Sequence, residues 1–282
     1  MTHIKEKVMK LFFFLSALVS VAAVALICIF LFASGIPAIR EIGIFRFLLG
    51  TKWKPANHLY GIFPMIAGSF YVTVGALAVG VPIGILTAVF LARFAPKNIY
   101  TPLKSAVNLM AGIPSVVYGF FGLVVLVPLI REIFGGRGMS VLTASVLLGL
   151  MILPTIISVS EAAIRAVPES YYEGGLALGA SHERSVFYTV LPAAKRGIFA
   201  GVVLGIGRAV GETMAVMMVA GNQAVLPDSI LSGVRTLTTN IVLEMGYSTD
   251  LHREALIGTA VVLFVFILLI NLSLSLWGRR VK

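Results

Sequence analysis

Arg208 and Glu212 are two charged residues inside an apolar stretch, Gly201 to Asn222, and they are the strongest candidates for chemistry in this chain. The stretch predicts a membrane-spanning helix. Ionisable side chains inside a bilayer cost about 2.5–3.5 kcal/mol each and usually face a bundle interior or a water-filled path. Their i, i+4 spacing predicts that both lie on one helical face. The base precedes the acid, and this order stabilises a helix less than an acid followed by a base. The pair therefore indicates a functional site.

The composition is that of an integral membrane protein. Of 282 residues, 59% are hydrophobic and 12% are charged, whereas soluble domains average about 25% charged residues. The net charge of +10 would indicate nucleic acid in a soluble protein, but the charges flank apolar runs, so membrane lipid and not nucleic acid is the expected surrounding. The single cysteine, Cys28, lies in the first apolar run and is expected to be a small buried residue, outside any disulfide or metal site.

Six apolar segments predict an all-α integral membrane protein with six transmembrane helices. The predicted spans are Leu11–Ala33, Ile62–Leu91, Val107–Ile130, Val141–Ser160, Gly197–Gly221 and Ala255–Trp277. With the N-terminus inside, the inner segments carry thirteen Lys and Arg residues and the outer loops eight, which favours both termini in the cytoplasm. The first run exceeds the 7–15 apolar residues typical of a signal peptide, so an uncleaved helix is preferred over cleavage at Ala33-Ser34-Gly35.

Glycines in the predicted fifth span can bring another helix close. Gly201-xxx-Gly205 and Gly207-xxx-Gly211 have the required spacing. Packing within the chain and a seam between subunits are equal alternatives for them.

Three outer features complete the pattern. Trp53 and Tyr60 in the first outer loop are candidate interfacial anchors. The run Arg235–Asn240 is a candidate contact for an external protein or a passing anion, and a solvated loop explains it equally well. The four histidines lie outside the predicted spans and are scattered along the chain, so neither a metal site nor a proton relay is expected.

The segment Glu161–Arg196 joins the fourth and fifth spans and is too patterned for a simple turn. Pro168 suits the first turn of a short helix and Gly179 a left-handed helix end. Ser181 can cap a second short helix, which Pro192 is expected to close. The segment has an apolar face with nothing in the loop to bury it, which favours a docking surface. A helix lying in the membrane interface is the alternative.

Part of this segment resembles the EAA signature of ABC importer permeases, a Glu-Ala-Ala, Gly, Leu-Pro pattern whose spacing is matched throughout. The matching residues are Glu173, Gly174, Gly175, Gly179, Leu191 and Pro192. Gly174 and Gly175 stand where the family has alanines, and Thr189 where it has isoleucine. Each glycine should loosen its helix turn by up to about 1 kcal/mol. The resemblance implies a type I ABC importer permease fold and implies that Glu173 to Pro192 couple the chain to an ATPase subunit.

Three further stretches resemble the phosphate-specific permeases, and one of them resembles the PstC type. They are Gly112–Gly119, Gly207–Val216, and Arg235–Thr238 with Glu244–Tyr247. The resemblance runs from about Phe63 to Trp277. It implies that residues 62–282 form the permease core, with a coupling loop at about 161–196, and that residues 1–61 hold the first transmembrane helix and outer loop.

The same resemblance implies a set of partners and a location. The partners are two ATP-hydrolysing ABC subunits, a related permease of the PstA type as heterodimer partner, and an extracytoplasmic phosphate-binding protein. The location is the plasma membrane of a prokaryote. A second copy of this chain in place of the PstA-type subunit remains an alternative.

No Gly-xxxx-Gly-Lys-Ser/Thr phosphate loop occurs, so the chain is not expected to be an enzyme, to hydrolyse ATP or to hold a cofactor. The expected mechanism is alternating access driven through the cytoplasmic loop. Alternative cargoes are sulfate and molybdate. A secondary anion transporter that runs without ATP is a second alternative, disfavoured by the EAA-like loop and the lack of an evident repeat.

Arg208 is the residue expected to meet the anion, because a guanidinium stays charged and offers bidentate donors to phosphate oxygens. Glu212 would compete for those donors, so the pair predicts a switch that opens when phosphate takes Arg208. A static salt bridge is the alternative, although apolar packing could replace one at little cost. Thr213 could add a hydroxyl donor or bond its own backbone.

Overall fold

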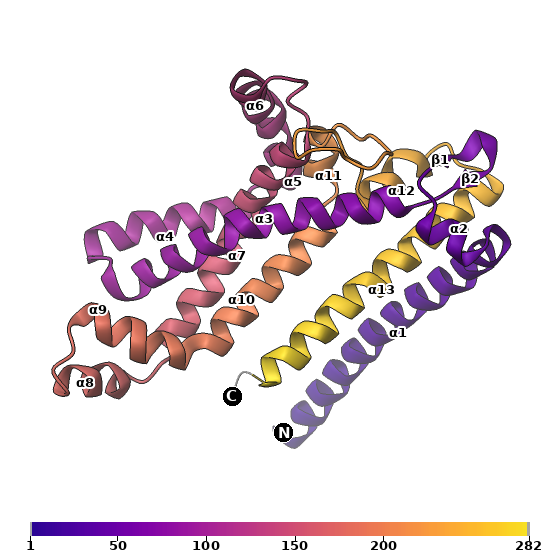
Figure 1. The fold of residues 1–282 in the computed structure, drawn as a ribbon. Helices are drawn as coiled ribbons and strands as arrows, with labels where there is room; N and C mark the ends of the chain where they lie inside the picture. The colour runs from indigo at the N-terminus through magenta and orange to yellow at the C-terminus, as the bar shows by residue number, and fades with distance from the viewer. Residues whose placement is uncertain (1, 281–282) are drawn as a thin grey trace.

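The structure is a computed structural model that describes residues 2–280, and it is almost wholly helical (Figure 1). Lys282, one of the inner charges counted above, lies outside the described residues. Within residues 2–280, six helices are long and apolar enough to cross a membrane: Lys5–Ile42, Phe63–Phe94, Ser115–Phe134, Val141–Arg165, His182–Gly211 and Asp250–Ser273. The prediction of an all-α protein with six spans is confirmed.

Three helices form the centre of the bundle: α3 (Phe63–Val89), α7 (Val141–Arg165) and α10 (Leu191–Gly211). Helix α7 packs between the other two and carries most of the largest buried cluster. Small residues allow the close approach. A Cβ atom on Gly80 of α3 would lie 2.8 Å from the Ile152 side chain, and one on Gly205 of α10 would lie 3.0 Å from Ile156. Gly201-xxx-Gly205 is therefore an intramolecular seam.

Helices α1 (Thr2–Ile42) and α13 (Asp250–Arg280) form an antiparallel pair beside this centre (Figure 1). The first helix continues to Ile42, nine residues beyond its predicted end at Ala33. The reason is packing against α13: a Cβ atom on Gly35 would lie 2.7 Å from Val261 and 3.1 Å from the Gly258 backbone. Burial against the partner helix keeps this less apolar part helical. Cys28, expected to be buried, is half-buried.

The third predicted span, Val107–Ile130, is wrong in its start. Helix α4 (Lys97–Gly112) ends at Ile113, whose backbone is extended before Pro114, as expected for a residue that precedes proline. The crossing helix begins at Ser115 with α5 (Ser115–Phe121) and ends with α6 (Val127–Phe134). Helix α4 is instead an amphipathic helix that packs against α7.

Three π-helical turns interrupt the helices, and each is followed two residues later by a proline. They are Phe90–Phe94 before Pro96, Gly122–Leu126 before Pro128, and Val186–Val190 before Pro192. In each case the last N–H before the proline bonds five residues back, as in Leu191 to Val186. Proline lacks an N–H and crowds the preceding turn, so a wider turn lets the chain pass without a break.

The two ends of the bundle differ in what they carry. At one end lie both termini, α8 (Glu169–Ala177) and α9 (His182–Ser185); at the other lie α2 (Ile44–Leu49), α11 (Met214–Val219), α12 (Leu237–Met245) and a small hairpin (Figure 1). The hairpin strands are β1 (Trp53–Lys54) and β2 (Leu59–Tyr60), joined by a 3-10 turn at Pro55–Asn57.

Trp53 and Tyr60 were predicted as interfacial anchors, and that prediction is wrong. They pair across the hairpin and are both buried, in a cluster with Phe47 and Leu256. The hairpin folds back onto the ends of the spans, so its two aromatic rings fill a small core.

Candidate functional site

The chain breaks between Arg208 and Glu212, so the predicted continuous helix from Gly201 to Asn222 is wrong, as is the predicted span Gly197–Gly221. Helix α10 ends at Gly211 and Glu212 is extended, with φ −70° and ψ 129°. The two side chains therefore do not share a helical face. Glu212 Oε1 accepts a hydrogen bond from the Ala215 N–H at 3.2 Å. A carboxylate at a helix N-terminus is stabilised by the free N–H groups there, so Glu212 begins α11 instead of continuing α10.

Polar contacts hold this break against α3 and α12. The Thr238 hydroxyl donates to the Glu212 carbonyl at 3.2 Å, and the Leu237 N–H donates to Ser69 Oγ at 2.9 Å. A void of about 10 Å³ at the break is lined by Glu212 together with Ser69 and Thr73 of α3. A void of this size holds about one water molecule. The break is thus a polar joint of three helices.

Arg208 lies in the last turn of α10 and is half-buried. Within residues 2–280 its guanidinium forms no hydrogen bond and no ion pair, with Glu212 or with any other residue. It lies within electrostatic reach of Tyr118, whose hydroxyl donates to the Met110 carbonyl at 2.9 Å. The predicted resting salt bridge is absent from this conformation, and the donors of Arg208 are free.

The face of α10 that carries Arg208 is open. A Cβ atom on Gly207 or Gly211 would meet nothing within 4 Å, in contrast to the packed Gly201 and Gly205. Thr213 donates its hydroxyl to the Gly211 carbonyl at 3.3 Å, which is the local backbone bond that was the alternative to an anion contact. Arg208 therefore stands beside open space and Thr213 supports the break.

Residues 236–240 are buried and Arg235 is half-buried, so the explanation of the run Arg235–Asn240 as a solvated loop is wrong. Thr236 and Thr239 form a reciprocal capping box at the start of α12. The Arg235 guanidinium donates to the Asn222 carbonyl at 3.0 Å, to Asn240 Oδ1 at 3.1 Å and to Glu244 Oε1 at 2.6 Å. These bonds tie the chain that follows α11 to α12.

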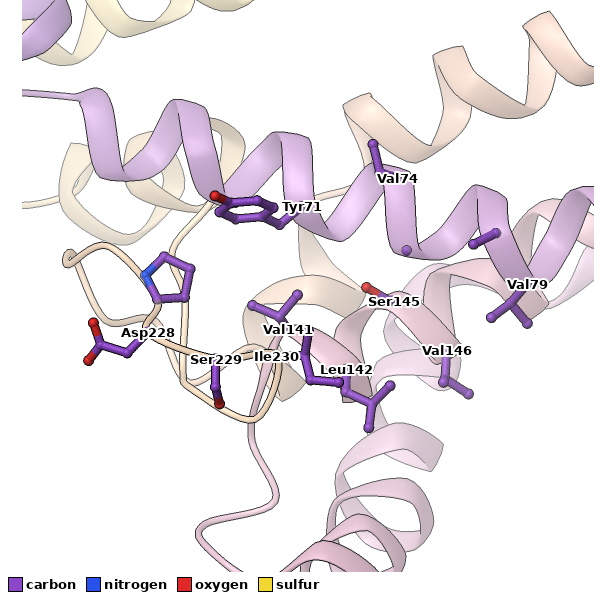
Figure 2. A pocket seen from close by; sticks show the side chains of 13 residues that line it. Tyr71, Val74, Val79, Val141, Leu142, Ser145, Val146, Asp228, Ser229 and Ile230 are labelled. Carbon is purple, nitrogen blue, oxygen red and sulfur yellow. The ribbon is translucent and has the colours of Figure 1, made fainter.

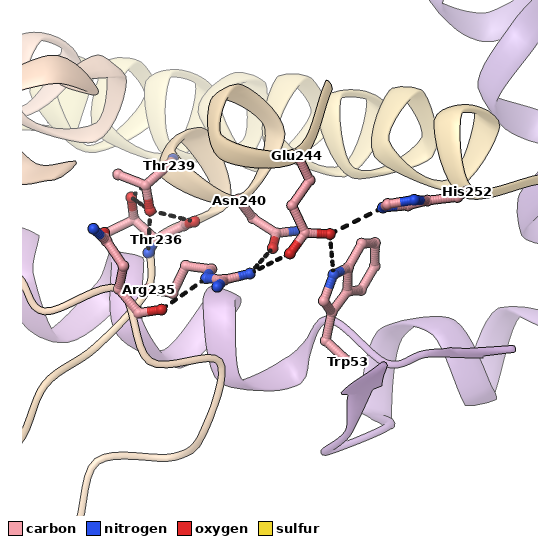
Figure 3. Close-up of polar contacts among 8 residues, drawn as sticks. Trp53, Arg235, Thr236, Thr239, Asn240, Glu244 and His252 are labelled. Atoms are coloured by element: carbon pink, nitrogen blue, oxygen red, sulfur yellow. Dashed lines mark hydrogen bonds and ion pairs between the residues drawn. The ribbon is translucent and has the colours of Figure 1, made fainter. Parts of the chain in front are cut away.

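Glu244 joins this cluster to two further segments (Figure 3). Its Oε2 atom accepts from Trp53 Nε1 at 2.8 Å and lies 2.9 Å from His252 Nε2. The Glu244 side chain is 9% exposed, so its carboxylate is largely removed from water and depends on these partners. We call Trp53, Arg235, Asn240, Glu244 and His252 the outer brace. The sequence shows the charges but not that Trp53 of the hairpin meets the residues between Arg235 and His252 at this point.

A cavity of about 550 Å³ lies between α3, α7 and the loop before α12, away from Arg208 (Figure 2). Tyr71 and Val74 of α3 face Val141 of α7 across it, and Asp228 stands at the loop side. Its walls are almost entirely apolar and its one charged side chain is acidic. This chemistry does not suit a small anion.

At the opposite end, the predicted pair of short helices is confirmed. Gly179 has φ +82°, and the Gly179 and Ala180 N–H groups donate to the Leu176 and Gly175 carbonyls at 2.8 and 3.1 Å. This is the left-handed ending expected for α8. Ser181 Oγ accepts from the Arg184 N–H at 3.3 Å and so caps α9.

The expectation that Pro192 closes the second helix is wrong. Helix α9, the π-helical turn and α10 form one continuous helix, His182–Gly211, with Pro192 at the second position of α10. Pro192 has no N–H to donate to the preceding turn, and the wider π-helical turn at Val186–Val190 lets the helix continue past it. A displacement of α9 is therefore transmitted directly to the helix that carries Arg208.

The two glycines of the EAA-like motif have different surroundings. A Cβ atom on Gly175 would lie 2.6 Å from Ser185 Oγ and 3.1 Å from Ser185 Cβ, so an alanine there would press on α9. A Cβ atom on Gly174 would meet nothing within 4 Å. Gly175 thus permits the close approach of α8 and α9, whereas nothing in the structure requires Gly174.

Large apolar side chains point away from the protein around this motif. Leu178 is 92% exposed and Tyr188 is 79% exposed, and Glu173 on α8 is exposed as well. An open hollow of about 850 Å³ lies beside Tyr188 and Arg184. Leu191 is half-buried and Pro192 exposed at the start of α10. Exposed apolar groups rimmed by charge are typical of a docking surface.

Contacts that the sequence did not predict fasten α8 and α9 to α3. Arg93, in the π-helical end of α3, donates to Glu169 at 2.8 Å. The Phe94 ring packs edge-on against His182 with centroids 4.7 Å apart, and His182 Nδ1 lies 2.7 Å from the Tyr172 hydroxyl. Two of the four histidines, His182 here and His252 beside Glu244, are therefore structural contacts.

Glu161 anchors the same end and was also missed. It is buried at the end of α7, where it accepts from Lys104 Nζ at 2.7 Å, Arg165 Nε at 2.9 Å and the Tyr100 hydroxyl at 3.0 Å. Arg165 also donates to the Leu91 carbonyl at 2.8 Å. A signal was present: an acid at the end of an apolar run with a base four residues later. No group of three or more metal-ligating side chains occurs among the described residues.

Comparisons with known proteins agree with this geometry. The family model described as "Binding-protein-dependent transport system inner membrane component" matches residues 80–282. The chain is 43% identical over 215 residues to the probable ABC transporter permease protein YqgH of Bacillus subtilis, covering 74% of this chain and 70% of that protein. It is 34% identical over 230 residues to the phosphate transport system permease protein PstC of Pasteurella multocida, covering 74% and 72%.

Among solved structures, the fold is similar to a bacterial ABC transporter involved in the import of the acidic polysaccharide alginate. The TM-score is 0.61, with 15% sequence identity and coverage of 94% of this chain and 96% of that chain. At this identity the likeness shows the fold alone.

Proposed function

Because the chain belongs to the family of binding-protein-dependent transport system inner membrane components, and so is a multi-pass membrane component of an ABC importer, we propose that its cargo is inorganic phosphate. The relatives named PstC support this cargo. The observation that carries the proposal is the unpaired Arg208 guanidinium on the open face of α10, directly before the helix break. Phosphate oxygens match its bidentate donors.

Glu212 has a second role in this proposal. Its Oε1 atom is engaged by Ala215, while within the described part of the chain its Oε2 atom has no hydrogen-bond partner. A free carboxylate oxygen can accept a hydrogen bond from the P–OH group of a protonated phosphate. Sulfate carries no such hydroxyl at neutral pH. Glu212 thus favours phosphate over sulfate or molybdate and, instead of masking Arg208, fixes the break beside it. Thr213 supports that break through its bond to Gly211.

The assembly follows from the family and from the exposed end of the bundle. ABC importer permeases work with ATPase subunits and a substrate-binding protein. We place one ATPase subunit at Glu173, Gly174, Gly175, Gly179, Leu191 and Pro192 of this chain and a second on the partner permease, which is of the PstA type and completes a heterodimer. Both termini lie in the cytoplasm at this end. ATP hydrolysis belongs to those partners. Residues 62–282 are the permease core, and residues 1–61 are a separate N-terminal helix and outer loop.

Motion has a direct path in this arrangement. The continuous helix His182–Gly211 begins at the docking surface and carries Arg208 in its last turn. Closure of the ATPase subunits would tilt this helix and move Arg208 relative to the polar joint at Glu212. Phosphate delivered from outside would then meet Arg208 before the site opens inward.

Uptake of radiolabelled phosphate by energised cells in low phosphate tests the proposal. Deletion of the gene, in cells without a second phosphate system, should abolish high-affinity uptake; excess arsenate should compete and excess sulfate or molybdate should not. Arg208→Ala should reduce uptake by more than about hundredfold at normal membrane levels, since it removes a charge-assisted bidentate contact. Arg208→Lys should recover only part of it, because an ammonium cannot bind in bidentate fashion.

Three results would overturn this proposal. Unchanged uptake in the deletion strain removes the transport role in phosphate import. Full competition by sulfate removes the cargo and leaves the importer class. Uptake that persists when the ATPase subunit is inactivated would favour a secondary transporter.

A further inference from the structure

A hollow of about 540 Å³ lies on the outer end of the protein, between the end of α1, helix α2 and the hairpin. Two permanently charged cations, Arg46 and Lys52, line it together with His58. All three side chains are exposed. Among the described residues none of them forms a side-chain hydrogen bond or ion pair. The hollow thus offers free donors, in contrast to the Arg235 guanidinium of the outer brace, which donates to three acceptors.

One carboxylate partly offsets the positive charge of the hollow. Glu41 also lines the hollow and lies close to the Tyr60 hydroxyl. Burial, and then the Glu41 carboxylate, raise the pKa of Tyr60, so its phenol stays protonated and can donate. The lining therefore holds two cations, one phenol donor and one carboxylate, with a net positive charge.

The floor of the hollow is a rigid crossing of two backbone segments at Gly50 and Gly61. A Cβ atom on Gly61 would lie 2.4 Å from the Gly50 carbonyl, so the two strands touch where only glycine fits. The Gly61 N–H donates to the Lys52 carbonyl at 3.0 Å and the Phe63 N–H to the Gly50 carbonyl at 3.1 Å. The positions of Arg46 and Lys52 are thus set by the fold.

The hollow lies at the level where the spans end. The first span ends at Ile42 and the last begins at Asp250, and Ile42 and Leu251 both line the hollow. Helix α2 beside it buries Phe47 and exposes other large apolar side chains, with Phe45 77% exposed. The exposed set on α2 is Ile44, Phe45 and Leu49. A short helix with exposed apolar residues and adjacent bases is typical of the membrane interface.

We propose that this hollow binds the phosphate headgroup of an anionic phospholipid from the outer leaflet, with Arg46 and Lys52 as its contacts. The acyl chains lie against Ile44, Phe45 and Leu49, and the phosphodiester enters above the Gly50–Gly61 crossing. The lipid fastens the N-terminal unit, residues 1–61, to the bilayer at the point where it packs on α13. This site does not depend on the cargo of the importer.

Two other occupants share part of this chemistry. Inorganic phosphate would use the same cations, and an acidic loop of the external binding protein would also complement them. Neither accounts for the exposed apolar side of α2 at the same edge. A lipid satisfies both the charged lining and the apolar neighbour, which is why it is favoured.

Native mass spectrometry of the assembled transporter, purified in detergent and titrated with phosphatidylglycerol or phosphatidylcholine, tests the site. The double variant Arg46→Gln with Lys52→Gln should bind phosphatidylglycerol about thirtyfold more weakly, since each interfacial cation contributes roughly a factor of five. Lys54→Gln, also exposed and basic in the same hairpin but outside the hollow, is the matched control and should change binding less than twofold. Glu41→Gln should strengthen phosphatidylglycerol binding severalfold, because it removes the one carboxylate among the described residues that line the hollow and so ends its repulsion of the lipid phosphate.

The outcomes separate the occupants. Equal phosphatidylglycerol binding by the wild type and the double variant overturns the proposal, as does equal binding of phosphatidylcholine. Displacement of the bound lipid by millimolar inorganic phosphate assigns the hollow to the free anion. Displacement by the purified binding protein assigns it to that protein. Phosphate uptake is measured separately, so failure of the lipid site leaves the cargo proposal untouched.

Discussion

The two ends of the bundle reverse the usual placement of side chains. At the end with α8 and α9, apolar groups such as Leu178 and Tyr188 are exposed. At the end with α12, the charged groups Arg235 and Glu244 are buried and bonded to four segments. An apolar surface without cover requires a partner, whereas buried charges with all partners in place fix a geometry.

This difference assigns different jobs to the ends. In the proposed mechanism, the α8–α9 end docks on the ATPase subunit and moves with it. In the same mechanism, the α12 end keeps the polar joint at Glu212 in place while α10 moves. A transporter that alternates between two openings needs one part that follows its motor and one that resists it.

Breaking the outer brace should have the largest effect on stability. Glu244→Ala removes the acceptor for Arg235 and Trp53 and leaves a buried guanidinium short of a partner, which costs about 3 kcal/mol. Thermal unfolding of the purified complex in detergent measures it. Glu173→Ala, an exposed acid at the other end, is the control and should change stability by under about 0.5 kcal/mol. Similar losses for both variants would remove the contrast between the ends.

The second largest effect tests the docking end through its glycines. Gly175→Ala should destabilise the α8–α9 pair by about 1–3 kcal/mol because its Cβ presses on Ser185. Gly174→Ala, one residue away in open space, should be neutral or stabilise α8 by up to about 1 kcal/mol. Limited proteolysis of the α8–α9 loop measures both. Equal protection of the two variants would show that the loop lacks the close approach described here.

Local signals in the sequence predicted the docking end well. Gly179 and Ser181 carry their structure in residue type alone, since a left-handed helix end and a cap are local devices. The six spans follow equally from runs of apolar residues. These features depend only on residues that are neighbours in the sequence, so the sequence alone is enough to predict them.

The outer brace and the break at Glu212 were not predictable in the same way. Trp53 meets Glu244 only after the spans pack, because 191 residues separate the two, and nothing near either residue in sequence indicates the other. The sequence did not predict the break, because Gly211, Glu212 and Thr213 lie inside an apolar run that is long enough for one continuous helix. Two contacts end the helix there: the hydrogen bond that the Ala215 N–H donates to the Glu212 carboxylate, which is local, and the bond that Thr238 donates to the Glu212 carbonyl, which is tertiary.

A smaller effect, seen in binding and not in stability, is expected from Leu178→Ser. Leu178 is almost fully exposed, so the free energy of unfolding should change by under about 0.5 kcal/mol. Loss of its burial at the ATPase interface should weaken association of the ATPase subunit about tenfold. Titration of the ATPase subunit onto permease in nanodiscs measures the affinity. Ile133→Ser, at another large apolar residue that is 61% exposed but lies on α6, should leave it unchanged, and a matching loss there would contradict a docking role for the α8 end.

The smallest effect is expected where α8 is tied to α3. A double-mutant cycle with Arg93→Gln and Glu169→Gln isolates their interaction. Glu169 is 58% exposed, so water screens the pair and the coupling energy should be about 0.2–1 kcal/mol. Arg93→Gln alone should cost more than Glu169→Gln, because the guanidinium also lies 5.8 Å from the Tyr172 ring centroid. A weak link suits a surface that must shift with its motor. A coupling energy above about 2 kcal/mol would make this contact as firm as the outer brace, and the docking end would then be a fixed part of the frame.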